Sequence, residues 1–296
     1  MADQQNSTLP QSTLLAGRTC LVTGAAMGIG EAIARAFHAQ GANVVLADVS
    51  DAGEAVAGEL GERAVFAPCD VSVEADVARA VDLAVERFGG LDVMVNNAGV
   101  GSAYDDPSAV EEADMDRTFA INQKGVMFGI KHAARVMADN TQGGGGNTQG
   151  GGGNGGSIIN IASIAALSGG TSGFIYTGTK GAVVALTRSA ALHLGDRRIR
   201  VNALAPGIIL TPIYEASYPP GIAERVLSHQ TSTQQPIRRL GRGADVAGPA
   251  VFLASDLSAY VTGQVIAVDG GYSATHRGAL EAGFSFLQEV MAEQES

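Results

Sequence analysis

A tyrosine and a lysine in the stretch YTGTK have the types and spacing to exchange a proton with a substrate oxygen. On a helix, Tyr176 and Lys180 share one face, because side chains four positions apart are neighbours there. A tyrosine with a pKa near 10 is a poor base at neutral pH, but a lysine ammonium beside it favours the phenolate and lowers that pKa. The pair is therefore a candidate acid–base group for an alcohol or a carbonyl. Ser163, after SIINIA, could donate a hydrogen bond to the same oxygen.

A glycine-rich turn near the N-terminus could bind the phosphates of a nucleotide. The stretch CLVTG runs into AAMGIG, where Gly24, Gly28 and Gly30 give the spacing G-x-x-x-G-x-G. Small residues let the chain turn tightly and approach a pyrophosphate, while the following helix points free N–H groups at the anion. Ordinary βα turns also carry such glycines, so the interpretation depends on later residues. Asp48 follows Gly30 by 18 residues, close to the ~20 typical of a carboxylate that binds ribose hydroxyls.

The same carboxylate predicts which nicotinamide cofactor is bound. Asp48 would accept hydrogen bonds from a free 2′-hydroxyl and repel a 2′-phosphate. Val49, Ser50 and Asp51 follow it, and position 27 is Met rather than a basic residue. NAD is therefore expected in preference to NADP.

The elements that must position these residues alternate between apolar strands and amphipathic helices. The expected strands are RTCLVTG, NVVLADV, RAVFAPCD, LDVMVNNAG, SIINIAS, IRVNALAPG and GQVIAVDGG. Such alternation predicts βαβ units, and hence an α/β, Rossmann-type, doubly wound parallel sheet of about seven strands in a single domain. Asp70, in PCDV, then lies at the carboxyl edge of the sheet, where such folds bind ligands.

We expect a catalytic domain at 16–273, a flexible polar tail at 1–15 and an extension at 274–296. The irregular region 212–239 is interpreted as a substrate lid. The stretch TQGGGGNTQGGGGNGG, at 141–156, enters a strand that delivers Ser163 at its far end, so it should lie at the amino edge, mobile and dispensable. The extension has one apolar helical stripe, formed by Leu280, Phe284, Leu287 and Met291.

Composition narrows the function classes. The chain has 296 residues, is 46% hydrophobic and carries a formal net charge of −11, which disfavours nucleic-acid binding. It has no apolar run long enough for a membrane span, and its N-terminus lacks the pattern of a secretory signal. Cys20 and Cys69 are expected to be buried free thiols of a cytoplasmic protein. The five histidines lack metal-ligand spacing, so no metal is expected.

Together these motifs resemble the short-chain dehydrogenase/reductase family over about residues 15–273. The family's TGxxxGIG matches TGAAMGIG at 23–30, and its NNAG matches 96–99. Asn122 in FAINQKG matches the catalytic asparagine, Ser163 lies 13 residues before Tyr176, and the YxxxK motif is present. A PG-x-[IV]-x-T segment completes the set. Gly178 and Thr179 depart from the Ala-Ser common before the lysine, without touching the acid–base pair.

The resemblance implies hydride transfer between a nicotinamide and a carbinol carbon. Tyr176 would exchange the alcohol proton, Lys180 would lower its pKa and hold the nicotinamide ribose, Ser163 would orient the substrate oxygen, and Asn122 would hold a water that relays protons. The implied cofactor-binding residues also include Gly24, Met27, Gly28, Ile29, Gly30, Asp48, Val49, Asp70, Val71, Asn97, Ala98, Gly99, Pro206, Gly207, Ile209 and Thr211. Candidate substrate contacts are Ile213, Tyr214, Tyr218 and Leu227.

The leading hypothesis is an NAD-dependent oxidoreductase that interconverts a secondary alcohol and its ketone, with a cyclic or hydrophobic substrate such as a terpenoid or steroid-like alcohol. One alternative is an acyl-thioester ketoreductase, against which Asp48 argues because those enzymes usually need NADP. Another is a non-catalytic nucleotide-sensing protein, against which the intact catalytic set argues. The resemblance also implies a homotetramer that pairs helices near 116–138 and 177–194.

Overall fold

The computed structural model describes residues 13–102, 106–139, 155–168, 172–215 and 221–274. Tyr218, the repeat at 141–154, the apolar stripe of the extension and most of the N-terminal tail therefore lie outside the described residues. The expectations for those segments stay predictions.

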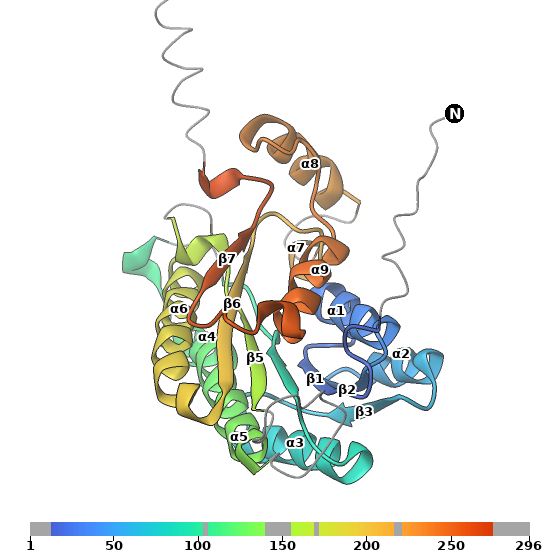
Figure 1. Cartoon of the computed structure of the whole chain (residues 1–296). Coiled ribbons are helices and arrows are strands. Elements are labelled where there is room, and N and C mark those ends of the chain that lie inside the picture. The colour runs from blue at the N-terminus through green and yellow to red at the C-terminus, as the bar shows by residue number, and fades with distance from the viewer. Residues whose placement is uncertain (1–12, 103–105, 140–154, 169–171, 216–220, 275–296) are drawn as a thin grey trace, which may run out of the picture.

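The described chain forms one parallel sheet in the order β3-β2-β1-β4-β5-β6-β7, shown in Figure 1. The strands are β1 Thr19–Thr23, β2 Asn43–Asp48, β3 Ala64–Pro68, β4 Val93–Asn96, β5 Gly156–Ile161, β6 Ile199–Pro206 and β7 Val265–Val268. The order reverses between β1 and β4, so a crevice opens there at the carboxyl ends of the strands. The predicted doubly wound, seven-stranded sheet is confirmed.

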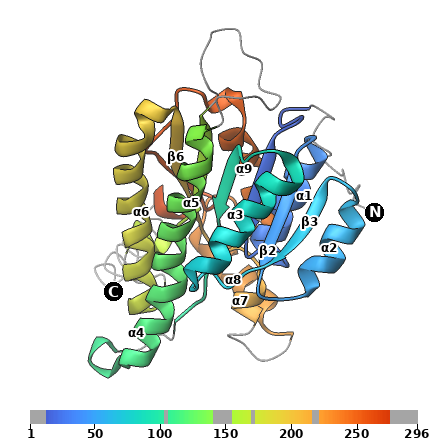
Figure 2. The same ribbon diagram turned by 90° about the horizontal axis from the view of Figure 1, so that it is seen from below.

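Helices cover both faces of the sheet, as Figures 1 and 2 show. One face carries α1 Gly28–Ala39, α2 Ala52–Leu60 and α9 Gly243–Ala254. The other carries α3 Glu74–Phe88, α5 Gly125–Asp139 and α6 Phe174–Leu194. Central strands are buried on both sides, so β1 reads TCLVT and is buried throughout rather than alternating. Helix α4 Glu112–Phe119 leads through a π-helical turn into α5, whereas α7 Pro212–Glu215 and α8 Ala223–Gln234 lie outside these two layers.

Three features differ from the sequence interpretation. The region 212–239, expected to be irregular, contains α7 and α8. The stretch GADVAGPAVFLA forms α9 despite its internal Pro249, because its apolar side packs on α1 and the sheet. Leu15, placed in the tail, is fully buried and its N–H donates to the Gln40 carbonyl. The packed chain therefore starts earlier than residue 16.

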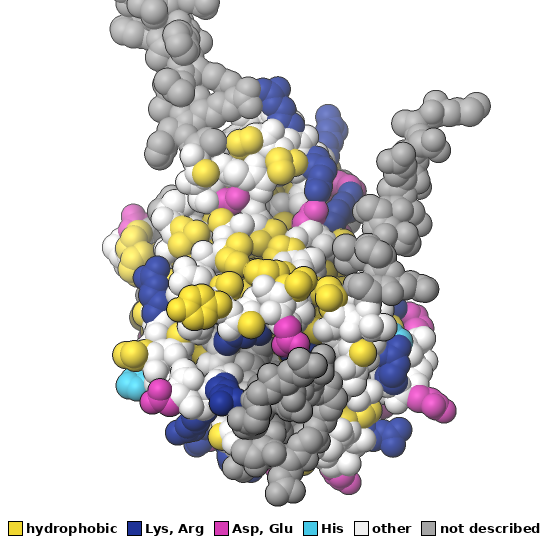
Figure 3. All heavy atoms as spheres, viewed as in Figure 1, with side chains coloured by type: hydrophobic (Ala, Val, Ile, Leu, Met, Phe, Trp, Pro, Cys, Tyr) yellow, Lys and Arg dark blue, Asp and Glu magenta, His cyan; other side chains and the backbone are white. Residues whose placement is uncertain are grey.

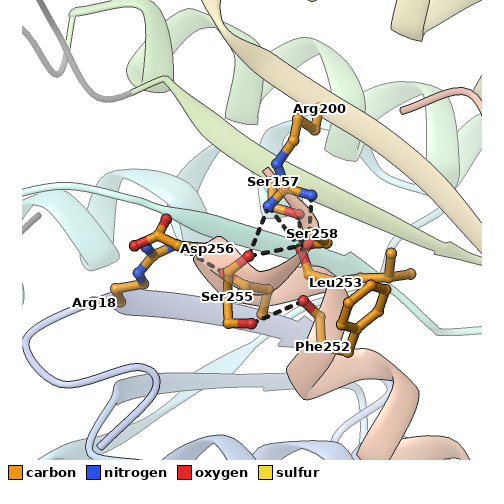
Figure 4. Close-up of polar contacts among 9 residues, drawn as sticks. Arg18, Ser157, Arg200, Phe252, Leu253, Ser255, Asp256 and Ser258 are labelled. Atoms are coloured by element: carbon orange, nitrogen blue, oxygen red, sulfur yellow. Dashed lines mark hydrogen bonds and ion pairs between the residues drawn. The ribbon is translucent and has the colours of Figure 1, made fainter. Parts of the chain in front are cut away.

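The amino edge of the sheet is held by a polar cluster, shown in Figure 4. Arg200, near the start of β6, donates to the Leu253 carbonyl at 2.8 Å and to the Ser258 hydroxyl at 2.9 Å. Ser157, near the start of β5, donates to the same carbonyl at 2.8 Å. Carbonyls at a helix C-terminus lack intrahelical partners, so these donors fix the end of α9 against the strands. β5, which the Gly-rich stretch precedes in the sequence, begins at Gly156 on this same edge.

The two cysteines match their prediction as free, buried thiols. Burial raises the pKa of Cys20 well above its usual value and, together with nearby carboxylates, raises the pKa of Cys69 to about 12. Because the thiolate is the reactive form, both are inert packing residues.

A hydrophobic surface lies on the face of the molecule that carries β7 and α9, where yellow side chains gather in Figure 3. All four residues of β7 retain some exposure, which sets this edge strand apart from the fully buried β1.

Candidate active site

The candidate acid–base pair lies in the first two turns of α6, as the spacing predicted. The Lys180 Nζ atom is 5.6 Å from the centre of the Tyr176 ring. It donates a hydrogen bond of 2.8 Å to the carbonyl of Ile161, the last residue of β5. Ser163 follows two residues later and hydrogen-bonds the Tyr176 side chain. The end of β5 thus brings the serine to the tyrosine and anchors the lysine.

The charge state of this pair differs from the expectation. Burial raises the pKa of Tyr176, and the hydrogen bond from Ser163 opposes that rise. Burial also lowers the pKa of Lys180 to about 8. In the chain by itself burial is the largest effect on Tyr176, so its pKa lies above its usual value rather than below it. The physical reason is that the protein interior disfavours the charged form of both groups, and no carboxylate contributes to either shift.

Asn122 lies in a turn of π-helix, Ala120–Lys124, between α4 and α5. Its Oδ1 accepts from the Val100 N–H at 2.8 Å, and its Nδ2 donates to the Val100 carbonyl at 2.9 Å and to the Thr179 hydroxyl at 3.3 Å. Such bulges are frequent at functional sites because they redirect a side chain from the regular helical path. Here the bulge aims a fully buried amide at the loop after β4 and at α6.

The loop after β4 closes this constellation. A Cβ added to Gly99 would lie 3.2 Å from the Asn122 Oδ1 and 3.4 Å from the Lys180 Nζ. The asparagine, the lysine and this loop therefore meet at one point, although 23 and 81 residues of sequence separate Gly99 from the other two.

The glycine-rich turn before α1 needs its glycines for close approach. A Cβ on Gly24 would lie 2.8 Å from the Ala98 Cα, and one on Gly30 would collide with the Gly24 carbonyl oxygen. Gly24 and Gly28 also have φ values of +64° and +63°, a left-handed conformation that favours glycine. The turn is therefore packed against the loop after β4, with room for no other residue at positions 24 and 30.

The N-terminus of α1 fits an anion. The first N–H groups of any helix have no intrahelical partner, and its dipole favours negative charge there. Met27, which precedes α1, makes no side-chain cap to those groups and is 43% exposed. Ile29 packs on the core behind the turn. These are the features expected of a pyrophosphate cradle.

Asp48 ends β2, as predicted, and is nearly buried beside this turn. One carboxylate oxygen accepts from the Ala26 N–H and the other from the Ser50 N–H, both at 2.9 Å. An oxygen of a carboxylate has two acceptor positions, so each retains one for a hydroxyl. Val49, next along, is exposed at the same edge.

Asp70 lies two residues beyond β3 and organises the turn that follows. Its Oδ1 accepts from the Ser72 N–H at 2.9 Å and from the Ser72 hydroxyl at 2.7 Å. Val71 is buried against α5, because a Cβ on Gly125 would lie 3.0 Å from it. Asp70 is thus held at the carboxyl edge, as predicted.

The segment after β6 borders the glycine-rich turn from the other side. Gly207 lies against Asp269, and Ile209 is buried and bridges to Gly241. A Cβ on Gly28 would lie 3.6 Å from the methyl group of Thr211. Pro206, Gly207, Ile209 and Thr211 therefore run along the same crevice as the turn before α1.

Helix α7 carries two of the candidate substrate contacts. Ile213 is 45% exposed and lies near Gly101 in the loop after β4. Tyr214 packs with Ile208, Leu227 and Leu240, so it supports the base of α8. Leu227 is buried, which makes it a packing residue in this structure.

The sequence interpretation assigned no role to several polar side chains on the strands. The Thr23 hydroxyl accepts from the N–H groups of Asn97 and Ala98 at 3.0 and 3.1 Å, while the Asn97 amide donates to the Thr23 and Gly24 carbonyls. This network ties β4 to the glycine-rich turn. The sequence signal that could have revealed this network is the polar Thr23 at the end of the largely apolar strand β1.

A second network fixes α6 to the sheet. The Asn96 amide donates to the Asn160 Oδ1 at 2.8 Å, and the Asn160 amide donates to the Thr187 hydroxyl at 2.9 Å. All three are buried, and a buried polar network whose members are satisfied defines one arrangement of its elements. The axis of the helix that carries Tyr176 is therefore set from the middle of the sheet.

A cavity of about 350 Å³ lies between the end of β7 and the connection from α8 to α9; Ile209 lines it, but none of the four candidate catalytic residues does. Its polar lining is already paired within the protein. Gln235 donates to the Ile237 and Arg239 carbonyls, Arg239 pairs with Asp245, and Asp269 accepts from Gly271. We therefore assign the candidate chemistry to the crevice at α6.

Across the ranges described above, no helix is long and apolar enough to cross a membrane, and no group of His, Cys, Asp or Glu side chains could hold a metal ion.

Comparison with known proteins agrees with this geometry. Residues 24–273 match the family described as enoyl-(acyl carrier protein) reductase. The chain is 41% identical to (+)-borneol dehydrogenase 2 of Salvia officinalis over 88% of this chain and 91% of that protein. It is 40% identical to momilactone A synthase of Oryza sativa subsp. japonica over 93% and 95%, and 37% identical to xanthoxin dehydrogenase of Arabidopsis thaliana over 91% and 94%.

Proposed function

The chain belongs to the short-chain dehydrogenase/reductase family, and from that premise we propose that it is an NAD-dependent enzyme that interconverts a secondary alcohol and its ketone. The observation that carries this proposal is the convergence of Asn122, Ser163, Tyr176 and Lys180 beside the loop after β4. A sensor of nucleotides would have no use for a buried lysine and a half-buried tyrosine beside a serine hydroxyl.

Each residue of this set has a role that follows from its contacts. Ser163 and the Tyr176 hydroxyl hydrogen-bond each other, so both can hold one substrate oxygen. As the phenolate, Tyr176 takes the proton of that oxygen during oxidation, and as the phenol it returns the proton during reduction. Lys180, with a pKa of about 8, can receive or supply a proton at neutral pH. Asn122 fixes the loop at Val100 and leaves the lysine side of the crevice rigid.

The residues present fit a dinucleotide. The turn at Gly24–Gly30 offers free N–H groups to a pyrophosphate, and Asp48 offers two acceptor positions to ribose hydroxyls. When bound, the nicotinamide supplies the hydride acceptor or donor. The other candidate contacts, from Asp70, Val71 and Asn97–Gly99 to the segment 206–211, border the same crevice.

The choice of NAD rests on Asp48. Its carboxylate is nearly buried and bonded to the glycine-rich turn, and the candidate contacts Met27 and Val49 are exposed apolar residues. A 2′-phosphate would meet a fixed negative charge with no basic partner from these positions, which disfavours NADP.

A hydrophobic, cyclic substrate is supported by two observations. Ile213 presents an exposed apolar side chain beside Gly101 at the crevice. Relatives named for their activities include a borneol dehydrogenase and a xanthoxin dehydrogenase. We therefore propose a terpenoid or steroid-like secondary alcohol as the substrate class.

The proposal is tested by Tyr176→Phe, with Tyr260→Phe on the fully exposed Tyr260 as the matched control. We expect wild-type protein to reduce NAD with cyclic secondary alcohols in a spectrophotometric assay. Tyr176→Phe should lower kcat by about 10²- to 10⁴-fold, the usual contribution of a positioned acid–base group, and should leave NAD affinity within two-fold. Turnover undiminished in Tyr176→Phe would refute the mechanism.

The same assay separates the alternatives. Reduction of an acyl-thioester ketone with NADPH, without oxidation of free alcohols, would support a ketoreductase of acyl thioesters. Binding of NAD without turnover of any alcohol or ketone would support a nucleotide sensor.

We further propose a homotetramer in the cytoplasm that pairs copies through α5 and α6. Met127 on α5 and Leu192 on α6 are 45% and 79% exposed, which gives that surface apolar side chains to bury. Light scattering at several concentrations should give four times the mass of one chain.

A further inference from the structure

One hydroxyl outside the candidate catalytic set hydrogen-bonds the backbone of its central residue. The Ser102 Oγ atom, in the loop after β4, accepts from the N–H of Tyr176 at 3.1 Å. The two residues are 74 positions apart.

The N–H that Ser102 receives needs a partner from outside its helix. The first intrahelical bond of α6 runs from the Thr177 N–H to the Gly173 carbonyl at 3.0 Å. The N–H of Tyr176 precedes that bond, so it is one of the groups that every helix start leaves unpaired. Gly173 precedes α6 and has no side chain to cap it. Ser102 thus caps the helix from a distant segment.

The loop that carries Ser102 also contacts three other parts of the candidate site. Val100 exchanges two hydrogen bonds with Asn122, Gly99 approaches Lys180, and Gly101 lies near Ile213 on α7. A second bond holds the far side of the same turn, because the Thr179 hydroxyl donates to the Tyr176 carbonyl at 2.8 Å and receives Asn122. The peptide of Tyr176 is therefore held at its N–H by Ser102 and at its carbonyl by Thr179.

We propose that Ser102 is a positioning residue for Tyr176, which sets the first turn of α6 so that the phenol lies against Ser163 and Lys180. This inference rests on the proposed dehydrogenase function. Removal of the hydroxyl would take a cap from the first turn of α6, where Phe174 is 58% exposed and Ile175 supplies the packing. A displacement of about 1 Å of a reacting group lowers a rate by roughly 10²-fold.

The test compares Ser102→Ala with Ser102→Thr, which keeps the hydroxyl, and with Ser108→Ala, which removes a serine hydroxyl whose partner is the local Asp106. In Ser102→Ala we expect kcat to fall roughly 10- to 100-fold while NAD affinity, measured by quenching or calorimetry, stays within two-fold. Ser102→Thr should restore most of the rate, and Ser108→Ala should match wild type.

The pH profile distinguishes positioning from support of the fold. The hydrogen bond from Ser163 lowers the pKa of Tyr176, so a displaced phenol should titrate higher and the acidic limb of the kcat profile for oxidation should move to higher pH in Ser102→Ala. A fall in kcat with an unchanged limb, or a rate equal to wild type, would overturn the proposal. If Ser102→Ala does not fold, Ser102→Cys, a weaker acceptor, should give an intermediate rate and limb. If wild type turns over no alcohol or ketone, the proposed function fails rather than the role of Ser102.

Discussion

At the scale of single residues, Asp48 combines a structural and a recognition role. Its carboxylate joins β2 to the glycine-rich turn through the Ala26 N–H, and the same group would select the cofactor. Loss of the Asp48 side chain would therefore change two properties at once. It would alter the preference between NAD and NADP, and it would also remove the hydrogen bond that holds the glycine-rich turn.

Asp48→Asn separates these roles, because the amide keeps an acceptor for the Ala26 N–H and removes the charge. We expect the ratio of kcat/KM for NAD over NADP to fall about 10- to 100-fold, since one repulsive charge near a phosphate amounts to a few kcal/mol. Asp51→Asn, three residues further along and without a side-chain cap bond, is the control and should keep the wild-type ratio. An unchanged ratio in Asp48→Asn would remove the basis for NAD.

The lowered pKa of Lys180 predicts how the free energy of unfolding depends on pH. That pKa falls from 10.5 to about 8 on burial. At pH 7 the lysine is charged in both states, and the folded protein bears the full desolvation cost. As pH rises past 8 the folded state loses the proton first, so the unfolded state binds more protons and stability rises with pH.

Relative to Lys180→Met, the wild-type free energy of unfolding should therefore increase by about 2 kcal/mol between pH 7 and pH 10. Urea unfolding at both pH values measures this, and other titrating groups cancel in the difference. A difference between the two proteins that stays constant would mean that Lys180 is not desolvated in the folded chain.

At the scale of elements, the candidate site lies where elements begin or end. Its residues lie at the carboxyl ends of β1, β2, β4 and β5 and at the N-termini of α1 and α6. The π-helical turn between α4 and α5 shows the same principle, because it places Asn122 where a regular helix would have carried another side chain. Close backbone approach then limits which residues these ends accept.

Gly30→Ala tests this limit in the turn before α1. The added methyl group would collide with the Gly24 carbonyl, so we expect the Kd for NAD to rise at least about 10-fold and the free energy of unfolding to fall by about 1–3 kcal/mol. Gly58→Ala in α2, where nothing lies within 4 Å of the new methyl, is the control. It should leave the Kd unchanged and stabilise the fold by about 0.4–1 kcal/mol. Equal affinities in both variants would show that the turn does not bind the cofactor.

At the scale of the whole molecule, the two edges of the sheet have different tasks. The carboxyl edge carries the candidate chemistry, and the amino edge carries the Arg200 cluster that holds α9 (Figure 4). Burial and the nearby Arg18 lower the pKa of Arg200 to about 10, so it stays charged at neutral pH.

Arg200→Met should therefore destabilise the protein without changing its chemistry. It removes one of the donors to the Leu253 carbonyl and the donor to the Ser258 hydroxyl, and a lost charge-assisted hydrogen bond costs about 1.5–3 kcal/mol. We expect thermal or urea unfolding to show that loss, with kcat and KM within two-fold of wild type. Arg197→Met, on an exposed arginine nearby, should show neither effect. A large fall in kcat would mean that the two edges are coupled.

The sequence by itself determined the strands, the parallel, doubly wound sheet and the membership in the family, because apolar runs and motif spacing are local properties that one chain displays directly. It located Asp48 at the end of β2 and Tyr176 and Lys180 on one helix for the same reason. It missed α9, whose glycines and proline oppose a helix until the core of α1 and the sheet covers its apolar side.

Only the tertiary structure decided the charge state of the acid–base pair and the partners that hold it. Desolvation depends on what surrounds a group, so burial raised the pKa of Tyr176 where its helical neighbour alone would lower it. The Tyr176 N–H donates to Ser102, and the Asn160 amide donates to Thr187, so both hydrogen bonds join segments far apart in the sequence. The Thr179 hydroxyl donates to the Tyr176 carbonyl and orients the same turn. The spacing of the motifs encodes none of these contacts. The physical reason is that a motif specifies only which chemical groups are available. Packing decides which of these groups come into contact, and how far burial shifts their pKa values.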